Sequence, residues 1–173
     1  MTDRPRTARA IIIGNELLTG KIADKNLATL AGVLRRLGVV LERAVVIPDV
    51  AEIIEREVRE AALASSWVFT SGGVGPTHDD LTVAAVASAF DEEVVVSPEL
   101  EALIRLAYGD RLREGHLLMA RVPRGCRLVR SDEIPWPATL MRNVWVLPGV
   151  PEIFELKMKL VEEIVGAGIP FVS

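Results

Sequence analysis

Short runs of apolar residues recur along the chain and predict its strands. The runs at residues 10–13 and 67–70 are apolar almost throughout, which is typical of strands buried on both faces of a parallel sheet. Arg142 and Asn143 separate the last two runs and predict a hairpin there. The predicted strands are residues 10–13, 39–47, 67–70, 94–96, 126–129, 139–141 and 144–147.

Between the strands, apolar residues recur three and four positions apart and predict amphipathic helices. Gly38 would end the first helix in a left-handed conformation, and Asp49 would cap the second. Ser97 would cap a further helix, with Pro98 at its first position. Residues 109–130 are harder to assign. The predicted helices are residues 27–37, about 53–62, about 81–90, a helix that begins at 98, and 151–165.

The alternation of strands and helices predicts an α/β fold, a three-layer α/β/α sandwich around a mostly parallel mixed sheet. The hairpin near the end accounts for the antiparallel part. A chain of 173 residues is close to the usual size of one domain, and no repeat, low-complexity segment or linker divides it. We therefore expect a single domain over residues 1–173, with ligands at the carboxyl ends of its parallel strands.

Composition and charge exclude several classes of function. Half of the residues are hydrophobic but only 5% are aromatic, so the core must be largely aliphatic. The net charge of −4 gives no basic footprint for nucleic acid, and no run of 18 apolar residues predicts a membrane segment. The single cysteine, Cys126, cannot form an intramolecular disulfide. We expect a soluble, cytoplasmic protein that binds neither nucleic acid nor membranes.

A glycine-rich loop follows one of the predicted buried strands and precedes a helix. In Ser71, Gly72, Gly73, Val74 and Gly75 the backbone can turn sharply, so that its amide groups and the helix amino terminus form a cradle for phosphate. The loop lacks the lysine of a P-loop, and it lacks the third glycine of the dinucleotide fingerprint. Standard ATPases and dehydrogenases are therefore excluded.

Carboxylates follow the ends of two buried strands. Asp79 and Asp80 come directly after the glycine loop and could cap the next helix, hold a divalent cation, or do both. Glu16 and Asp24, after the first strand, are candidate metal ligands or general bases. Asn26 is either a polar ligand to a substrate or the cap of the following helix.

Pro148 and Gly149 form a third tight turn, after the last predicted strand. Proline and glycine are common between a strand and a helix, so this turn alone indicates little. Because buried parallel strands end at one edge of a sheet, the three loops together would enclose a nucleotide-sized ligand. The sequence therefore favours a phosphate-containing small molecule as the ligand.

Three motifs occur in order at these loops. Residues 14–26 match the pattern G-[ND]-E-L…G-x-I-x-D-x-N, residues 70–82 match T-x-G-G-x-G-P-x-x-x-D-x-T, and residues 147–151 read L-P-G-V-P. Together they resemble the molybdopterin-binding (MoCF) domain family, and most closely its CinA-type amino-terminal domains. The resemblance covers nearly the whole chain.

The resemblance implies the fold of the MoaB and MogA proteins and self-association as a homodimer or homotrimer. In the molybdenum-cofactor branch of the family, the aspartate that matches Asp80 serves in the binding and adenylation of molybdopterin. CinA-type domains are associated with metal-dependent hydrolysis of the pyrophosphate in ADP-ribose. Both ligands carry phosphate, so the predicted cradle suits either.

The chain departs from the CinA type in two ways. Full-length CinA proteins have a second, carboxy-terminal amidase domain, for which 173 residues leave no room, so we expect a stand-alone or shortened relative without amidase activity. Residues 134–138 read Ile-Pro-Trp-Pro-Ala where CinA-type sequences have a Gly-Thr-Ala-Pro-Gly-like loop. Trp136 would cover apolar surface or stack on a base.

We expect a pyrophosphatase that acts on ADP-ribose or a related nucleotide. The amides from Gly72 to Gly75 would hold phosphate, and Asp80 with Glu16 or Asp24 would position Mg²⁺, Mn²⁺ or Co²⁺ to activate water. Whether the chain is an enzyme stays open at this point. One alternative is a module that binds molybdopterin or its adenylated form, and another is a regulatory or oligomerisation domain.

Overall fold

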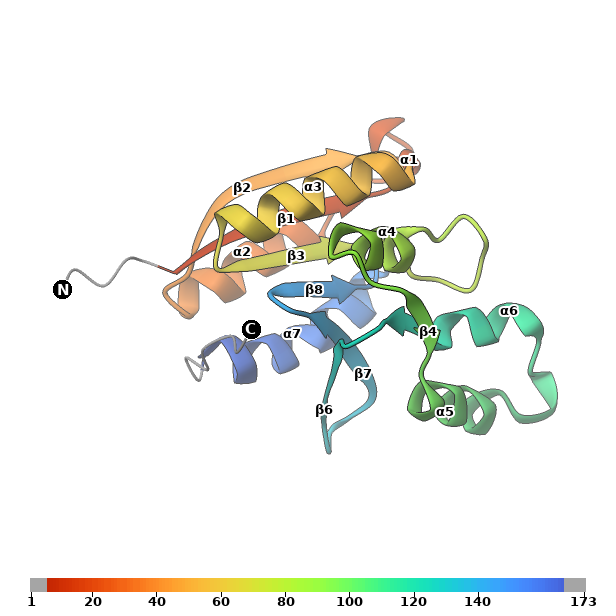
Figure 1. Ribbon diagram of the computed structural model, residues 1–173. Helices are drawn as coiled ribbons and strands as arrows, with labels where there is room; N and C mark the ends of the chain where they lie inside the picture. The colour runs from red at the N-terminus through yellow and green to blue at the C-terminus, as the bar shows by residue number, and fades with distance from the viewer. Residues whose placement is uncertain (1–5, 167–173) are drawn as a thin grey trace.

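A six-stranded mixed sheet forms the centre of the protein, whose computed structural model describes residues 6–166 (Figure 1). Its strands are β1 (Thr7–Ile13), β2 (Val40–Ile47), β3 (Trp67–Ser71), β6 (Arg127–Ser131), β7 (Ile134–Met141) and β8 (Val144–Leu147). In the order β2-β1-β3-β8-β7-β6, the first four strands are parallel, whereas β7 and β6 are antiparallel to their neighbours. The ends of the predicted single domain, residues 1–5 and 167–173, lie outside the described part.

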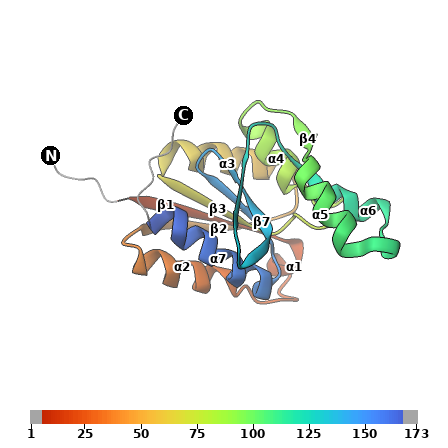
Figure 2. The same ribbon diagram turned by 90° about the horizontal axis from the view of Figure 1, so that it is seen from below.

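Helices cover both faces of the sheet (Figure 2). On one face lie α2 (Asn26–Arg36) and α7 (Pro151–Gly166), and on the other lie α3 (Ala51–Ala64) and α4 (Thr82–Ala89). The predicted three-layer α/β/α sandwich with a mostly parallel mixed sheet is thus confirmed. No helix within residues 6–166 combines the length and the apolar character needed to cross a membrane.

Strand β1 is apolar throughout residues 10–13 because both of its faces are buried. Successive side chains of a strand point to opposite faces of the sheet, so that Ala10 and Ile12 pack with α2 and α7. Ile11 and Ile13 pack on the other face with α3 and α4. All four residues are at most 3% exposed. With helices on both faces, no position of this stretch remains for a polar side chain.

A smaller unit, which we call the arm, lies between α4 and β6 in the chain and projects beside the main sheet (Figure 1). It consists of β4 (Val94–Val96), α5 (Pro98–Tyr108), η1 (Gly109–Arg111), α6 (Glu114–Leu117), η2 (Leu118–Ala120) and β5 (Arg121–Pro123). The strand predicted at residues 94–96 is present, but it pairs with β5 in a separate two-stranded antiparallel sheet. Leu100, Ile104, Ala120 and Val122 form a small core of the arm's own.

Two predicted helix ends are confirmed. The hydroxyl oxygen of Ser97 accepts the N–H of Leu100 at 3.3 Å, and Pro98 is the first residue of α5. Gly38, after α2, has a φ of +67°, the left-handed conformation that glycine adopts without strain. Local sequence therefore determines where α5 begins and where α2 ends.

The chain changes direction across the sheet between β1 and β3. Helix α2 carries it from β1 to β2 on one face, and α3 carries it from β2 to β3 on the other face. The carboxyl ends of β1 and β3 are therefore adjacent, with their connections leaving to opposite sides. Open parallel sheets bind ligands at such a switch point.

Phe154 should be essential to the packing of α7, because it is 1% exposed in the core between α7 and the sheet. We expect Phe154→Ala to lower the free energy of unfolding by about 3–5 kcal/mol, since the change leaves a cavity. Leu106→Ala in α5 is the control, because Leu106 is 83% exposed, and should change it by no more than about 0.5 kcal/mol. Urea unfolding measures both, and equal losses would contradict the assigned packing.

Candidate functional site

The side chain of Asn26 joins the loops that follow β3 and β8. Its Nδ2 donates to Ser71 Oγ at 2.8 Å and to the carbonyl oxygen of Gly149 at 3.0 Å. Ser71 Oγ in turn lies 3.4 Å from the carbonyl oxygen of Pro148, to which it donates. Asn26 is 3% exposed, and it is the first residue of α2. Because both amide hydrogens are used within the protein, Asn26 clamps the loops together.

Backbone meets backbone at Gly72, where the three predicted loops converge. Its φ is +105°, and a Cβ there would collide with the carbonyl oxygen of Ile13 at the end of β1. The position of a Cβ on Gly149 lies 3.3 Å from the Cα of Gly72. Thr82 Oγ1 donates to the Gly72 carbonyl at 2.8 Å and fixes the loop from the side of α4. Only glycine fits this position.

The free amides of the glycine loop begin one residue later than predicted. Gly72 N–H donates to the carbonyl oxygen of Leu147 at 3.1 Å, so the prediction that this amide holds phosphate is wrong. Within residues 6–166, the N–H groups from Gly73 to Gly75 have no acceptor. Three successive unbonded amides on a fixed loop suit the oxygens of a phosphate group.

Asp80 is turned back onto the glycine loop. Its Oδ2 accepts from Thr77 N–H at 2.9 Å and from Thr77 Oγ1 at 2.6 Å. Its Oδ1 lies 3.1 Å from the position of a Cβ on Gly75 and has no hydrogen-bond partner in the described range. Helix α4 begins at Thr82 without any side-chain cap, so the predicted capping by Asp79 or Asp80 is not found. Asp80 therefore retains one free carboxylate oxygen beside the free amides.

The two carboxylates after β1 have different surroundings. Glu16 lies on the short helix α1 (Asn15–Leu18), and its Oε1 is 2.5 Å from the position of a Cβ on Gly14. The Glu16 carboxylate thus covers the end of β1 and has no hydrogen-bond donor within residues 6–166. Asp24 accepts from the N–H groups of Asn26 at 3.3 Å and Leu27 at 2.9 Å. Asp24 therefore holds the start of α2, the role that the sequence analysis gave to Asn26 as an alternative.

The acidic residues do not build a metal cage. No group of three or more His, Cys, Asp or Glu residues that could hold a metal ion occurs in the described part of the chain, and Asp79 is exposed. Mg²⁺ is, however, commonly bound by one or two carboxylates together with substrate phosphates and water. The free oxygen of Asp80 beside the loop amides fits a cation of that kind.

The prediction that Asp49 caps α3 is wrong. Asp49 instead joins the loop after β1 to the end of β2. Its Oδ2 accepts the N–H of Asn15 at 2.9 Å, and Asn15 Oδ1 accepts the N–H of Asp49 at 3.3 Å. Helix α3 is instead preceded by Val50, which caps nothing through its side chain. Only the register of the sheet, which pairs Ile13 with Ile47, brings Asn15 and Asp49 together.

Lys157 is a buried residue that the sequence analysis missed. It is 3% exposed, and its Nζ donates to the carbonyl oxygens of Trp136 and of Pro137, the latter at 3.1 Å. Burial lowers the pKa of Lys157 to about 8. Lys157 lies three residues after Phe154 and four before Val161, which are both buried. This helical spacing could have indicated that Lys157 is on the buried face of α7. Trp136 itself packs against the core of the arm, which confirms the packing alternative.

Residues 9–166 match the family described as "Probable molybdopterin binding domain". The chain belongs to this molybdopterin-binding domain family. The crystal structure of "the protein CinA with unknown function" from Thermoplasma acidophilum is 31% identical, with a TM-score of 0.84 over 93% of this chain and 98% of that one. The domain is therefore of CinA type. The "tungsten cofactor synthesizing protein MoaB" from Pyrococcus furiosus, 19% identical with a TM-score of 0.62, covering 95% and 94% of the chains, shares the fold.

Sequence relatives of this domain are longer proteins. A protein of Archaeoglobus fulgidus is 38% identical over 146 residues, which cover 84% of this chain and 62% of the relative. The "Probable FAD synthase" of Caenorhabditis briggsae is 33% identical over 172 residues, which cover 87% of this chain and 33% of the relative. The chain thus spans less than two thirds of these curated relatives.

Removing the clamp should destabilise the domain. Asn26→Ala leaves the Gly149 carbonyl and the Ser71 hydroxyl without their donor, so we expect a loss of about 1–3 kcal/mol in the free energy of unfolding. Asn15→Ala is the control, because its side chain makes one exposed hydrogen bond and should matter by no more than about 0.5 kcal/mol. Urea unfolding at pH 7 compares them, and a clamp variant as stable as the control would refute this role.

Lys157 should make stability depend on pH. Between pH 8 and about 10.4, the usual pKa of an unfolded lysine, the unfolded chain binds more protons at this residue than the folded protein does. The unfavourable contribution of Lys157 is therefore complete below pH 8 and fades as the pH rises. Relative to Lys157→Met, the wild-type protein should become more stable from pH 8 to pH 10. Unfolding curves that shift in parallel for both proteins would contradict this.

Proposed function

We propose that this CinA-type domain hydrolyses the pyrophosphate bond of ADP-ribose or a related dinucleotide. The observation that carries the proposal is the free oxygen of Asp80 beside the unbonded amides from Gly73 to Gly75. These groups lie at the carboxyl end of β3, beside β1, where parallel sheets bind ligands. The amides suit phosphate oxygens, and the carboxylate suits a cation that neutralises them.

Two considerations favour a pyrophosphate over a single phosphate. Hydrolysis of ADP-ribose is what the resemblance to CinA-type domains implies. In addition, a relative over most of this chain is named a probable FAD synthase, and FAD consists of two nucleotides joined by a pyrophosphate. The common chemistry of these compounds is a doubly substituted pyrophosphate, which we take as the substrate class.

In the proposed reaction, the oxygen of a water molecule attacks one phosphorus of the pyrophosphate. The bond from that phosphorus to the bridging oxygen breaks, and the bridging oxygen leaves with the electron pair. ADP-ribose and water thus give AMP and ribose 5-phosphate, and one proton of the attacking water passes to a base in this step. The second proton stays on the new phosphate group until that group ionises in solution. Glu16 would accept the first proton, because among Glu16, Asp24 and Asp80 it is the carboxylate with no hydrogen-bond donor within residues 6–166.

The amides from Gly73 to Gly75 would hold phosphoryl oxygens in place while charge develops on them. A divalent cation, bound together with the substrate, would supply positive charge against the same oxygens. Asp80 would hold that cation through Oδ1, since its Oδ2 is occupied by Thr77. The rigid contacts at Gly72 would keep both groups in fixed positions.

Incubation of the purified protein with ADP-ribose and Mg²⁺, Mn²⁺ or Co²⁺ tests the proposal, with AMP measured by chromatography. We expect AMP with at least one metal, and a loss of about 100-fold or more in kcat/KM for Asp80→Asn. Glu163→Gln is the matched control, because Glu163 is an exposed carboxylate near the far end of α7, and should keep full activity.

If no AMP forms above a heat-denatured control with any of the three metals, the hydrolase proposal fails. Titration with molybdopterin in a calorimeter then distinguishes the remaining functions of the family. Heat of binding that Asp80→Asn abolishes would identify a pterin-binding module. A silent titration would leave a regulatory or oligomerisation domain.

A further inference from the structure

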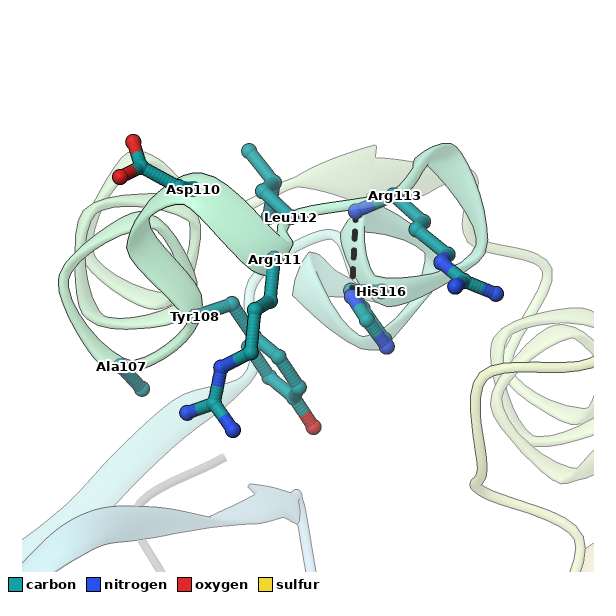
Figure 3. A pocket seen from close by; sticks show the side chains of 7 residues that line it. All are labelled: Ala107, Tyr108, Asp110, Arg111, Leu112, Arg113 and His116. Carbon is teal, nitrogen blue, oxygen red and sulfur yellow. Dashed lines mark hydrogen bonds between the residues drawn. The ribbon is translucent and has the colours of Figure 1, made fainter.

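The arm contains a pocket that lies outside the three loops (Figure 3). It has a volume of about 540 Å³, within the usual range for small-molecule sites. The end of α5, η1 and the start of α6 supply its walls, which include Tyr108, Asp110, Arg111, Arg113 and His116. The cavity is open to solvent rather than enclosed, and we call it the arm pocket.

A stacked pair of rings lines the arm pocket. The ring centroids of Tyr108 and His116 are 3.8 Å apart, and the ring planes are inclined by 18°. The backbone N–H of Arg113 donates to His116 Nδ1 at 3.1 Å (Figure 3). Because Nδ1 accepts this bond, the neutral imidazole carries its hydrogen on Nε2. Nε2 is therefore a hydrogen-bond donor on the side of the ring away from the Arg113 backbone.

The arm pocket also carries uncompensated positive charge. Arg111 and Arg113 are exposed and form no ion pair with any of residues 6–166. By contrast, Arg105 in the arm forms an ion pair with Glu101 at 2.6 Å. Arg124, which directly follows the arm, forms one with Glu93 at 2.7 Å. Guanidinium groups present paired N–H donors that match phosphate oxygens. With Asp110 as the one acidic residue of its lining, the pocket is suited to an anion.

Helix α6 connects the arm pocket to the glycine loop. The position of a Cβ on Gly115, the residue before His116, lies 3.0 Å from the carbonyl oxygen of Pro76. Pro76 follows directly on the free amides that end at Gly75. A side chain at position 115 would push α6 away from the loop, so glycine allows the two to touch. The arm pocket and the glycine loop are thus built on adjoining backbone.

We propose that the arm pocket is a second anion-binding site, which holds the phosphate group of a small organic phosphate. Arg111 and Arg113, whose side chains lie on opposite sides of the stacked rings in Figure 3, supply positive charge to the phosphate from two sides, and His116 Nε2 donates a hydrogen bond to it. The stacked rings offer apolar surface to the organic part of the ligand. This inference goes beyond the proposed hydrolysis, because binding at the arm requires no reaction at the glycine loop.

The two histidines make the test direct, because His78 lies in the glycine loop and His116 lines the arm pocket. Proton NMR follows the C2–H resonance of each, and His78→Gln assigns them. AMP, inorganic phosphate and adenosine are titrated into the wild-type protein at constant pH. We expect AMP and inorganic phosphate to shift the His116 resonance to saturation and adenosine to leave it unmoved. Tighter binding of AMP would identify an organic phosphate, and equal binding the free anion.

The variant Arg111→Gln/Arg113→Gln should weaken AMP binding at His116 by about 10-fold or more. Arg105→Gln/Arg124→Gln removes the same charge from outside the arm pocket and should leave that binding within about 2-fold. An unmoved His116 resonance with millimolar AMP and phosphate would overturn the inference, as would equal weakening by the two variants or an equal shift with adenosine. A shift of His78 alone would overturn it too, while leaving the proposed hydrolysis intact.

Discussion

The contact of backbone with backbone at Gly72 is the constraint on which the rest of the site depends. Because this residue has no side chain, the loop after β3 can pass against the Ile13 carbonyl at the end of β1 and against Gly149 after β8. The Asn26 amide then reaches both loops with its two hydrogens. The positions of the free amides and of Asp80 follow from this arrangement, since the loop that carries them starts at Gly72.

Hydrogen bonds inside the protein decide which of the polar groups are available to a ligand. The Gly72 amide, the Asn26 amide and the Asp24 carboxylate are each bonded to the fold. The amides after Gly72 and one oxygen of Asp80 are not. The site therefore offers a row of donors beside a single acceptor, an arrangement suited to a polyanion accompanied by a cation.

The sequence predicts the layers and the loops well, because both depend on short-range patterns. A buried strand such as β1 needs an unbroken apolar run, and the start of a helix such as α5 is marked by a capping residue, Ser97. The bonding of individual groups depends on partners far away in the chain. Asp49 meets Asn15 only through the register of two strands, and Lys157 finds its carbonyl partners only because β7 lies beside α7. The arm pocket was missed for the same reason, since nothing in the spacing of His116 indicates its stack on Tyr108.

The close packing of the loops at Gly72 has an implication for how such domains acquire new specificities. A side chain at Gly72 would collide with the Ile13 carbonyl, and one at Gly149 would press against Gly72, so substitution at either position disturbs the packing before it alters ligand preference. Chemical variety among proteins built on this scaffold must then enter through neighbouring segments whose side chains are free to change. The arm, which has a core of its own and joins the loop at Gly115, is the segment best placed for such divergence.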